Sequence, residues 1–219
     1  MENYMRNVME LKKIPFYLRE AVCEEMCHGI EVSNLAVFIA KELGEPEEFC
    51  RQIELAGVLH DIGKLKLTKY LYAEEGLLVE QMKYVRQHSA QSYQVALEAG
   101  YGDEIGKAVY HHHENYNGTG YPDNLRGSKI PWMARILRVC DVFIALTSDR
   151  SYRDAFDSKA ALEIMIDEVS DYDMEVFLAF QRVIHSDILG QGMGQIKQVR
   201  SSRQLKPLQL FEEEIKWLV

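Results

Sequence analysis

Histidine is the residue type in this chain whose placement most strongly suggests chemistry. Six of the seven histidines lie between positions 28 and 113, whereas solvated histidines would be scattered along the chain. Three of them, His111–His113, are consecutive. Neighbours on a helix point about 100° apart, so at a helix end two adjacent imidazoles can face one metal ion while the third turns away. The turn-forming Gly118, Gly120 and Pro122 follow at once, which predicts a shaped loop beside a metal site.

Two carboxylates extend this pattern. Asp61 directly follows His60 at the expected end of a helix, so an imidazole and a carboxylate that can bridge two ions lie together. Asp141 lies within a strongly apolar helical stretch, where an unpaired charge would be costly to bury. A salt bridge to an arginine would also explain Asp141, but the histidines favour a metal. Mixed nitrogen and oxygen ligands suit iron, manganese or zinc better than calcium or magnesium.

The spacing of apolar residues predicts the helices that position these side chains. We expect helices over 16–43, 46–59, 77–99, 102–113, 132–148, 158–169 and 173–189, with 205–219 as a short terminal helix or a contact segment. The longest stretch without a helical pattern is the loop at 115–131. No alternating strand pattern, repeat or low-complexity tract occurs, so the chain is predicted to be all-α.

The composition is that of a globular domain able to bury a full core, with 47% hydrophobic and 27% charged residues. A net charge of −9 argues against binding a nucleic-acid polymer, which requires a basic face. No apolar run is long enough for a membrane span, and no signal-peptide pattern opens the chain. The four cysteines lack a disulfide-framework spacing, which fits a reducing cytosol. We therefore expect a cytoplasmic protein with no membrane span.

Together the motifs resemble the HD-GYP family, a branch of the HD-domain metal-dependent phosphohydrolases. The resemblance covers about residues 24–180 and rests on the order and spacing of His28, His60-Asp61-Ile62-Gly63-Lys64, His88, His112-His113-Glu114, Gly120-Tyr121-Pro122 and Asp141. The stretches 147–153 and 172–173 also match. The implied fold is an HD-domain-like helical bundle with a long Gly-Tyr-Pro loop. We divide the chain into an N-terminal arm or helix (1–20), a catalytic domain (21–190) and a C-terminal extension (191–219).

The resemblance also implies two or three transition-metal ions, usually iron or manganese. The ligands implied for the first ion are His28, His60, Asp61 and Asp141. The second ion would take His88, His112 and His113, with Asp61 bridging. A third ion would add Glu24, which stands four residues before His28 and therefore on the same helix face.

A phosphodiester held at such ions would need cationic groups for its non-bridging oxygens. Lys64, four residues after His60, is the best candidate, and we expect Asp61 and Lys64 to be catalytic. Arg150 and Arg153 lie beyond the helix that carries Asp141 and can reach a phosphate. Without the resemblance, solvated surface arginines would explain this pair equally well.

Tyr121 is expected at the mouth of the pocket, where its ring or hydroxyl would meet the substrate and the ring can stack on a base. The alternative is an aromatic residue that only packs the loop. Together with Lys64 and the two arginines, Tyr121 completes the substrate-binding residues expected from the sequence.

The activity implied is hydrolysis of the bacterial second messenger cyclic di-GMP to the linear dinucleotide, or onward to GMP. One alternative is an HD-type phosphohydrolase of another nucleotide, including cyclic GMP-AMP, on which some family members act. Another is a non-catalytic sensor or interaction module for cyclic di-GMP, for which broken ligands are expected and none is broken. The chain has no room for the receiver or sensory domain to which most relatives are fused. We therefore expect it to act alone, as a homodimer, or under the control of a regulatory protein partner.

Four residues depart from the family pattern. Asn117 stands where an aspartate is usual, and Ile144 replaces an aspartate that would orient or balance charge near Lys64. Ser151 replaces a proline, and His111 takes a position usually held by an aromatic or apolar residue. All implied ligands are present, so these departures bear on rate and substrate choice more than on metal binding. We expect His111 to pack beside the site.

Overall fold

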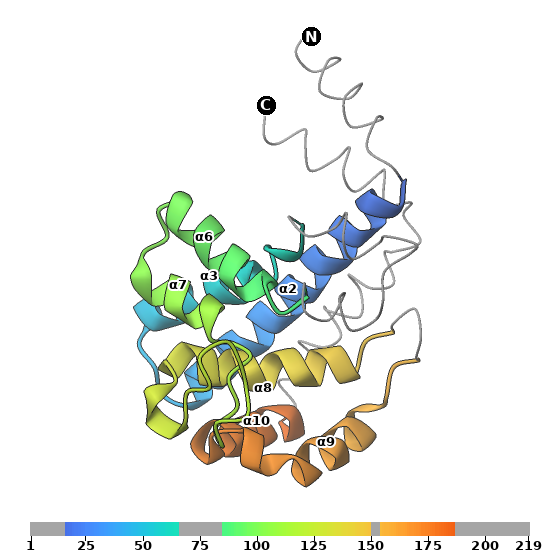
Figure 1. The fold of residues 1–219 in the computed structure, drawn as a ribbon. Helices are drawn as coiled ribbons and strands as arrows, with labels where there is room; N and C mark the ends of the chain where they lie inside the picture. Colours follow the sequence, from blue (N-terminus) through green and yellow to red (C-terminus); the bar gives the residue numbers. More distant parts are fainter. Residues whose placement is uncertain (1–15, 66–84, 150–153, 187–219) are drawn as a thin grey trace, which may run out of the picture.

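The structure, a computed structural model, describes residues 16–65, 85–149 and 154–186 (Figure 1). The described α-helices are α2 (Phe16–Glu42), α3 (Glu47–Leu59), α6 (His88–Glu98), α7 (Asp103–Tyr110), α8 (Trp132–Leu146), α9 (Ser158–Asp167) and α10 (Met174–His185). Two short 3-10 helices, η1 (Gly127–Lys129) and η2 (Val169–Asp171), lie in the connections. These ranges contain no strand, and the all-α prediction is confirmed. The expected C-terminal extension and the segment 205–219 lie outside the described residues.

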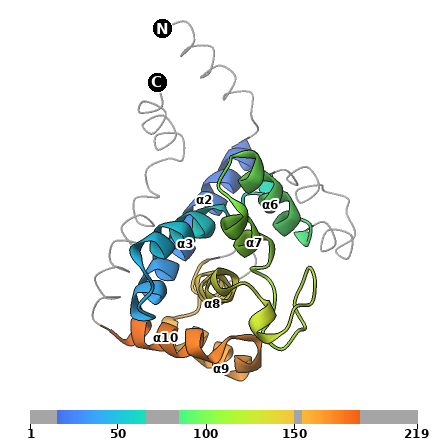
Figure 2. The same cartoon turned by 90° about the vertical axis from the view of Figure 1, so that its left-hand side faces the viewer.

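Helix α8 is the centre of the bundle. Figure 2 shows it end-on, with α2 and α3 on one side, α6 and α7 on another, and α9 and α10 beneath it. Because other helices surround it, α8 is apolar on nearly all sides, and Ile136, Leu137, Val139 and Phe143 are completely buried. Asp141 is on this helix and is itself buried. The element with the strongest apolar pattern therefore carries a carboxylate into the middle of the molecule.

Helices α2 and α3 pack unusually closely, and this contact brings two of the site's elements together. A Cβ added to Gly57 would lie 2.5 Å from the Cα of Ser33, so only glycine allows the two backbones to approach so closely. The Ser33 hydroxyl also donates a hydrogen bond to the carbonyl oxygen of Glu54 (2.8 Å). As a result, His28 on α2 lies beside the end of α3, where His60 and Asp61 follow.

The turn after α3 packs in the same way against α6. A Cβ on Gly63 would lie 2.2 Å from the carbonyl oxygen of His88, and the Gly63 N–H donates to the hydroxyl of Ser92 (2.8 Å). The glycine of the His60-Asp61-Ile62-Gly63-Lys64 stretch therefore holds the beginning of α6 against Asp61.

Within the described residues, the predicted helices match the observed ones closely, with corrections at the start of α6 and at the end of α7. The prediction of a continuous helix over 77–99 is wrong at residues 86–87, which form a turn, and α6 begins at His88. The His88 side chain bonds the carbonyl oxygen of Val85 (2.5 Å), which in a continuous helix would accept from the N–H of residue 89. Helix α7 likewise ends at Tyr110, so His111–His113 form a turn beyond it.

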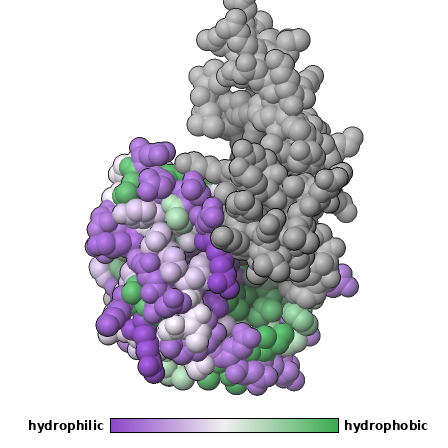
Figure 3. Space-filling view, viewed as in Figure 1, coloured by the Kyte–Doolittle hydropathy of each residue, from purple (hydrophilic) through white to green (hydrophobic). Residues whose placement is uncertain are grey.

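The surface is mostly polar in the view of Figure 3, with an apolar area in the region of α8 and α9. No described helix has both the length and the apolar character needed to cross a bilayer.

Candidate metal centre

Five helices place imidazoles and carboxylates at one point in the bundle. The first group consists of His28 from α2, His60 and Asp61 from the end of α3, and Asp141 from α8. The second group consists of Asp61, His88 from the start of α6, and His112 and His113 from the turn after α7. Within each group the ligand atoms lie within 4.8 Å of one another, and each group could hold a metal ion. Apart from Glu24, every predicted ligand is in one of the two groups.

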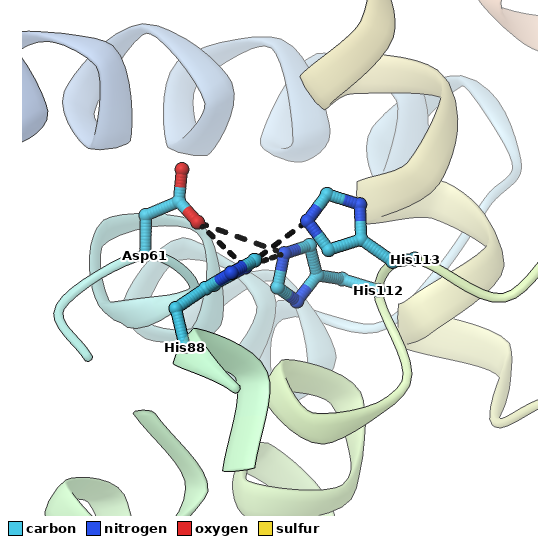
Figure 4. Close-up of side chains that lie close together, drawn as sticks. All are labelled: Asp61, His88, His112 and His113. Atoms are coloured by element: carbon cyan, nitrogen blue, oxygen red, sulfur yellow. Dashed lines mark hydrogen bonds and ion pairs between the residues drawn. The ribbon is translucent and has the colours of Figure 1, made fainter. Parts of the chain in front are cut away.

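Asp61 is shared because its two carboxylate oxygens face different groups. Its Oδ2 lies 3.2 Å from Nε2 of His60 and 3.7 Å from Nε2 of His28. Its Oδ1 lies 3.1 Å from Nε2 of His88 and 3.7 Å from Nε2 of His112 (Figure 4). This is the arrangement expected of a carboxylate that bridges two ions.

Asp141 closes the first group from the opposite helix. Its Oδ1 lies 3.0 Å from Nε2 of His28 and 3.8 Å from Nε2 of His60. Its other oxygen, Oδ2, lies 3.8 Å from Nδ1 of His113. Both buried carboxylates of the centre therefore face imidazoles of both groups.

The backbone fixes the orientation of three imidazoles. Nδ1 of His60, His88 and His112 lies 2.7, 2.5 and 2.6 Å from the backbone carbonyl oxygen three residues earlier. A carbonyl only accepts, so in each ring Nδ1 carries the proton and the lone pair of the neutral ring is on Nε2. All three Nε2 atoms face the centre, which is how metal-binding histidines are oriented by their outer partners.

The contacts among these nitrogens favour a bound cation. Nε2 of His88 lies 3.3 Å from Nε2 of His112 and 3.0 Å from Nε2 of His113 (Figure 4). Because Nδ1 carries the proton in His88 and in His112, the Nε2 lone pairs of these two rings face each other and repel unless a positive charge lies between them. Among the described residues, His60 Nε2 and Asp61 Oδ1 are also buried without a hydrogen-bond partner. The donor set of each group therefore fits a bound metal ion.

The ionisation of the centre agrees with this fit. Burial alone would raise the pKa of Asp61, but His60 and Lys64 outweigh it and hold this pKa well below its usual range. His28 and His60 do the same for the pKa of Asp141. Burial lowers the pKa of His60, but Asp61 and Asp141 overcome this effect and raise it to about 10. The position of His60 thus attracts positive charge.

The pKa values of His112 and His113 are lowered, in contrast to that of His60. Burial, together with His113, His60 and His88, holds the pKa of His112 well below its usual value. For His113, burial is the largest cause and the pKa falls to about 3. Both rings are therefore neutral at pH 7, which is the form that binds a metal.

Lys64 lies at the centre and is accompanied by Glu25, an acidic neighbour of Glu24 to which the sequence analysis assigned no role. The Lys64 ammonium lies 2.5 Å from Asp61 Oδ2 and 3.2 Å from Oε2 of Glu25 on α2. Glu24, the ligand expected for a third ion, is exposed and belongs to neither group. Glu25, three residues before His28 on α2, is therefore the acidic side chain of this segment that reaches the site, through Lys64.

Glu25 also bears on the departure at Ile144. The Ile144 side chain is only 1% exposed and packs in the hydrophobic core. The family pattern has an aspartate at this position near Lys64, and Ile144 cannot replace its charge. Glu25, from α2, provides a carboxylate for Lys64 instead.

Glu114, a second residue that the sequence analysis did not single out, shapes the Gly-Tyr-Pro loop. Its buried carboxylate accepts hydrogen bonds from the backbone N–H groups of Asp123 (2.7 Å) and Leu125 (3.0 Å). The signal in the sequence is an acidic residue that directly follows the ligand histidines and precedes a loop rich in free N–H groups. Glu114 therefore couples the shape of the loop to the position of His112 and His113.

Tyr121 lies at the second group, packed between protein partners. Its ring stacks on His113 with centroids 4.7 Å apart, and the Arg86 guanidinium lies over it at 5.1 Å. Burial raises the pKa of Tyr121, so its hydroxyl stays protonated and can donate a hydrogen bond. Because the ring already has two partners, this arrangement favours the hydroxyl over base stacking as the contact with a substrate.

Asn117 and His111, the other departures in this region, both have partners outside the two groups. The Asn117 amide donates to Asp171 Oδ1 (2.5 Å) and its carbonyl accepts from the Thr119 N–H (2.9 Å), which ties the loop to η2. His111 turns away, with Nε2 3.1 Å from Asp123 Oδ2, in agreement with the expectation that it packs beside the site. Arg150, Ser151 and Arg153 lie outside the described residues.

Known proteins resemble this chain in both sequence and fold. The family model of the HD domain matches residues 3–176. A cyclic di-GMP phosphodiesterase of Pseudomonas aeruginosa is 33% identical over 159 residues, which cover 72% of this chain and 38% of that protein. The 3'3'-cGAMP-specific phosphodiesterase 1 of Vibrio cholerae is 32% identical over 194 residues, which cover 87% of this chain and 41% of that protein. The chain thus spans about two-fifths of the length of these two relatives.

The likeness in fold extends to solved structures. A HDG"Y"P protein from Bdellovibrio bacteriovorus superposes with a TM-score of 0.58 at 20% sequence identity, over 73% of this chain and 52% of that one. At this level of identity the comparison concerns the fold.

Proposed function

Because this chain belongs to the HD domain family, we propose that it is a metal-dependent phosphodiesterase that hydrolyses a cyclic dinucleotide. The observation that supports this most directly is the position of Asp61, whose two oxygens face two separate sets of imidazoles. One bridging carboxylate between two such sets is what a two-ion phosphodiesterase requires.

The proposed ligands are the seven residues of the two groups. They are His28, His60, Asp61, His88, His112, His113 and Asp141. Metal ions held by these residues would supply a nucleophilic hydroxide at neutral pH and a clamp for the oxygens of the phosphodiester. Iron or manganese fits the mixture of imidazole and carboxylate donors. Glu24 remains a candidate for a third ion.

The surrounding side chains have separate roles in this proposal. Lys64 neutralises Asp61 and presents its remaining N–H to a phosphate oxygen. Tyr121 donates its hydroxyl at the mouth of the site. Arg150 and Arg153 complete the proposed set of cations for the substrate. The hydrogen bonds of Glu114 hold the loop in place, so that Tyr121 meets the substrate in one position.

The preferred substrate is cyclic di-GMP, with the linear dinucleotide or GMP as product. The curated relatives include enzymes named for cyclic di-GMP and enzymes named for 3'3'-cGAMP, so cyclic GMP-AMP is the second candidate. Both substrates present the same phosphodiester to the centre, and the choice between them depends on how the bases are recognised.

A turnover assay tests the proposal. Protein reconstituted with Fe²⁺ or Mn²⁺ should carry at least one ion for each of the two groups and should hydrolyse cyclic di-GMP. The assay compares cyclic di-GMP, 3'3'-cGAMP and the linear dinucleotides by separation of products, and metal analysis is done on the same samples. Protein that retains no metal after reconstitution, or metal-loaded protein that cleaves none of these substrates, would contradict the proposal.

A further inference from the structure

Arg138 is a cation at the edge of the metal centre that the sequence analysis did not single out. It lies on α8 three residues before Asp141, and therefore on the same face of the helix. The side chain is half-buried, and its Nε donates a hydrogen bond to Oδ1 of Asn115 at 2.9 Å. Asn115 is the second residue after His113, at the start of the Gly-Tyr-Pro loop.

Arg138 has no ion-pair partner among the described residues, and its two terminal nitrogens make no hydrogen bond to any of them. Lys64, by contrast, is paired with two carboxylates, and Arg135, one turn earlier on α8, is paired with Asp173 at 3.0 Å. Within the described part of the chain, Arg138 therefore combines an unpaired positive charge with donors that have no acceptor.

Arg138 lies beside the second group and the loop. Its hydrogen-bond partner Asn115 stands two residues after His113 and begins the loop that carries Tyr121. The side chains of His113 and Tyr121 belong to the mouth of the centre, since Tyr121 stacks on His113. The guanidinium thus lies close to the place where an anion bound at the second group would be.

A guanidinium held at Nε, with both terminal nitrogens free, is suited to an oxyanion. Its planar fork matches phosphate geometry, and a charge-assisted hydrogen bond is about twice as strong as a neutral one. A purely structural role would engage more of the donors, as in Arg135, which also bonds the carbonyl oxygens of Ile130 and Ser128. The free donors of Arg138 favour a ligand that binds from outside.

We propose that Arg138 binds a non-bridging oxygen of the phosphate that is cleaved, and that Asn115 positions it for this contact. The inference rests on the proposed function, because it assigns a residue to the substrate of the same centre. With Arg138, the phosphate would meet two cations: Arg138 on the side of the Gly-Tyr-Pro loop and Lys64 on the side of α3.

The test uses the metal-loaded protein and two substrates, cyclic di-GMP and bis(p-nitrophenyl) phosphate, which has a single phosphodiester and no base. The Arg138→Gln variant should lose about 10- to 100-fold in kcat/KM on both substrates, as expected when a charge-assisted contact to a reacting phosphate is removed. Arg138→Lys should retain part of the activity. Asn115→Ala should show a smaller loss of the same kind.

Two measurements separate this role from a structural one. Calorimetry should show weaker binding of inorganic phosphate to Arg138→Gln, while metal content and melting temperature match those of the unaltered protein. The control is Arg182→Gln. It removes the same charge from α10, where Arg182 pairs with Glu42 at the surface, and kcat/KM should stay unchanged for both substrates.

The inference fails if Arg138→Gln leaves kcat/KM and phosphate binding unchanged, or if its activity falls only together with metal content and melting temperature. A loss confined to cyclic di-GMP would also overturn it, because the contact would then lie away from the cleaved phosphate. Failure of the proposed function looks different: the unaltered protein would cleave bis(p-nitrophenyl) phosphate but no cyclic dinucleotide, and the Arg138 comparison could still be made.

Discussion

At the scale of single residues, the chemistry depends on which nitrogen or oxygen faces the centre. The histidines at 60, 88 and 112 expose Nε2 because a backbone carbonyl holds Nδ1, and Asp61 exposes one oxygen to each group. The residue types alone would allow many other arrangements. In the arrangement observed, each of these donor atoms points in one direction, toward the ion that its group could bind.

The neighbours His111 and His112 offer a matched test of this assignment. His112→Ala should reduce hydrolysis by more than about 100-fold, because even the outer partners of metal ligands cost about 10- to 100-fold when removed. His111→Ala, which alters a ring that faces Asp123, should stay within a few-fold of the unaltered protein. Steady-state kinetics and metal analysis measure both, with circular dichroism as a check on helical content. Equal losses in the two variants would argue against the assignment.

Asp61→Ala belongs to the same scale and should have the larger effect. It removes ligands from both groups at once, so metal content should fall at both sites and turnover should be abolished while helical content survives. Retained turnover in this variant would place the active site elsewhere in the chain.

At the scale of elements, close contacts between segments hold the donors in place. Glycines at positions 57 and 63 allow α2, α3 and α6 to meet near Asp61. Glu114 and Asn117 hold the Gly-Tyr-Pro loop from its two sides, through backbone N–H groups and through η2. The loop is thus part of the rigid frame of the site and sets the position of Tyr121.

The contact between Asn117 and Asp171 leads to a stability prediction for this loop. Asn117→Asp would place two carboxylates together where an amide now donates at 2.5 Å, and should lower the free energy of unfolding by about 1–2 kcal/mol. Adding Asp171→Asn should restore most of the loss, since an amide then donates in the reverse direction. Denaturant unfolding of the four proteins of this double-mutant cycle measures the coupling. Additive effects in the double variant would rule out a direct interaction.

At the scale of the whole molecule, the bundle buries carboxylates and imidazole lone pairs, and without a bound cation this burial lowers the stability of the folded protein. Asp61 and Asp141 are buried in the middle of five helices, and the Nε2 lone pairs of His88 and His112 face each other. Metal binding and folding should therefore be coupled, because the ions stabilise the folded state and have no comparable site in the unfolded chain.

Removal of the metal should accordingly lower the melting temperature. One site with free metal at about 100 times its dissociation constant adds about 2.7 kcal/mol to the stability of the folded state. Chelation should reverse this stabilisation, and Mn²⁺ or Fe²⁺ added in excess of the chelator should restore it. Differential scanning calorimetry measures the change, and Asp61→Ala should show little dependence on metal. A melting temperature unaffected by chelation, in protein shown to have lost its metal, would exclude the coupling.

The sequence by itself determined the helical class, because helical periodicity is a local property. The clustered histidines and the carboxylate inside an apolar helix indicated a metal site, and the resemblance to the HD-GYP family implied which residues form the two groups. Only the tertiary structure decided that His88 begins a helix, that Glu25 and not Glu24 meets Lys64, and that Asn117 joins the loop to η2. The unpaired donors of Arg138 also became apparent only in the folded protein. Each of these depends on distances between segments far apart in the chain, or on a side chain that takes over a backbone hydrogen bond, and residue spacing does not encode either.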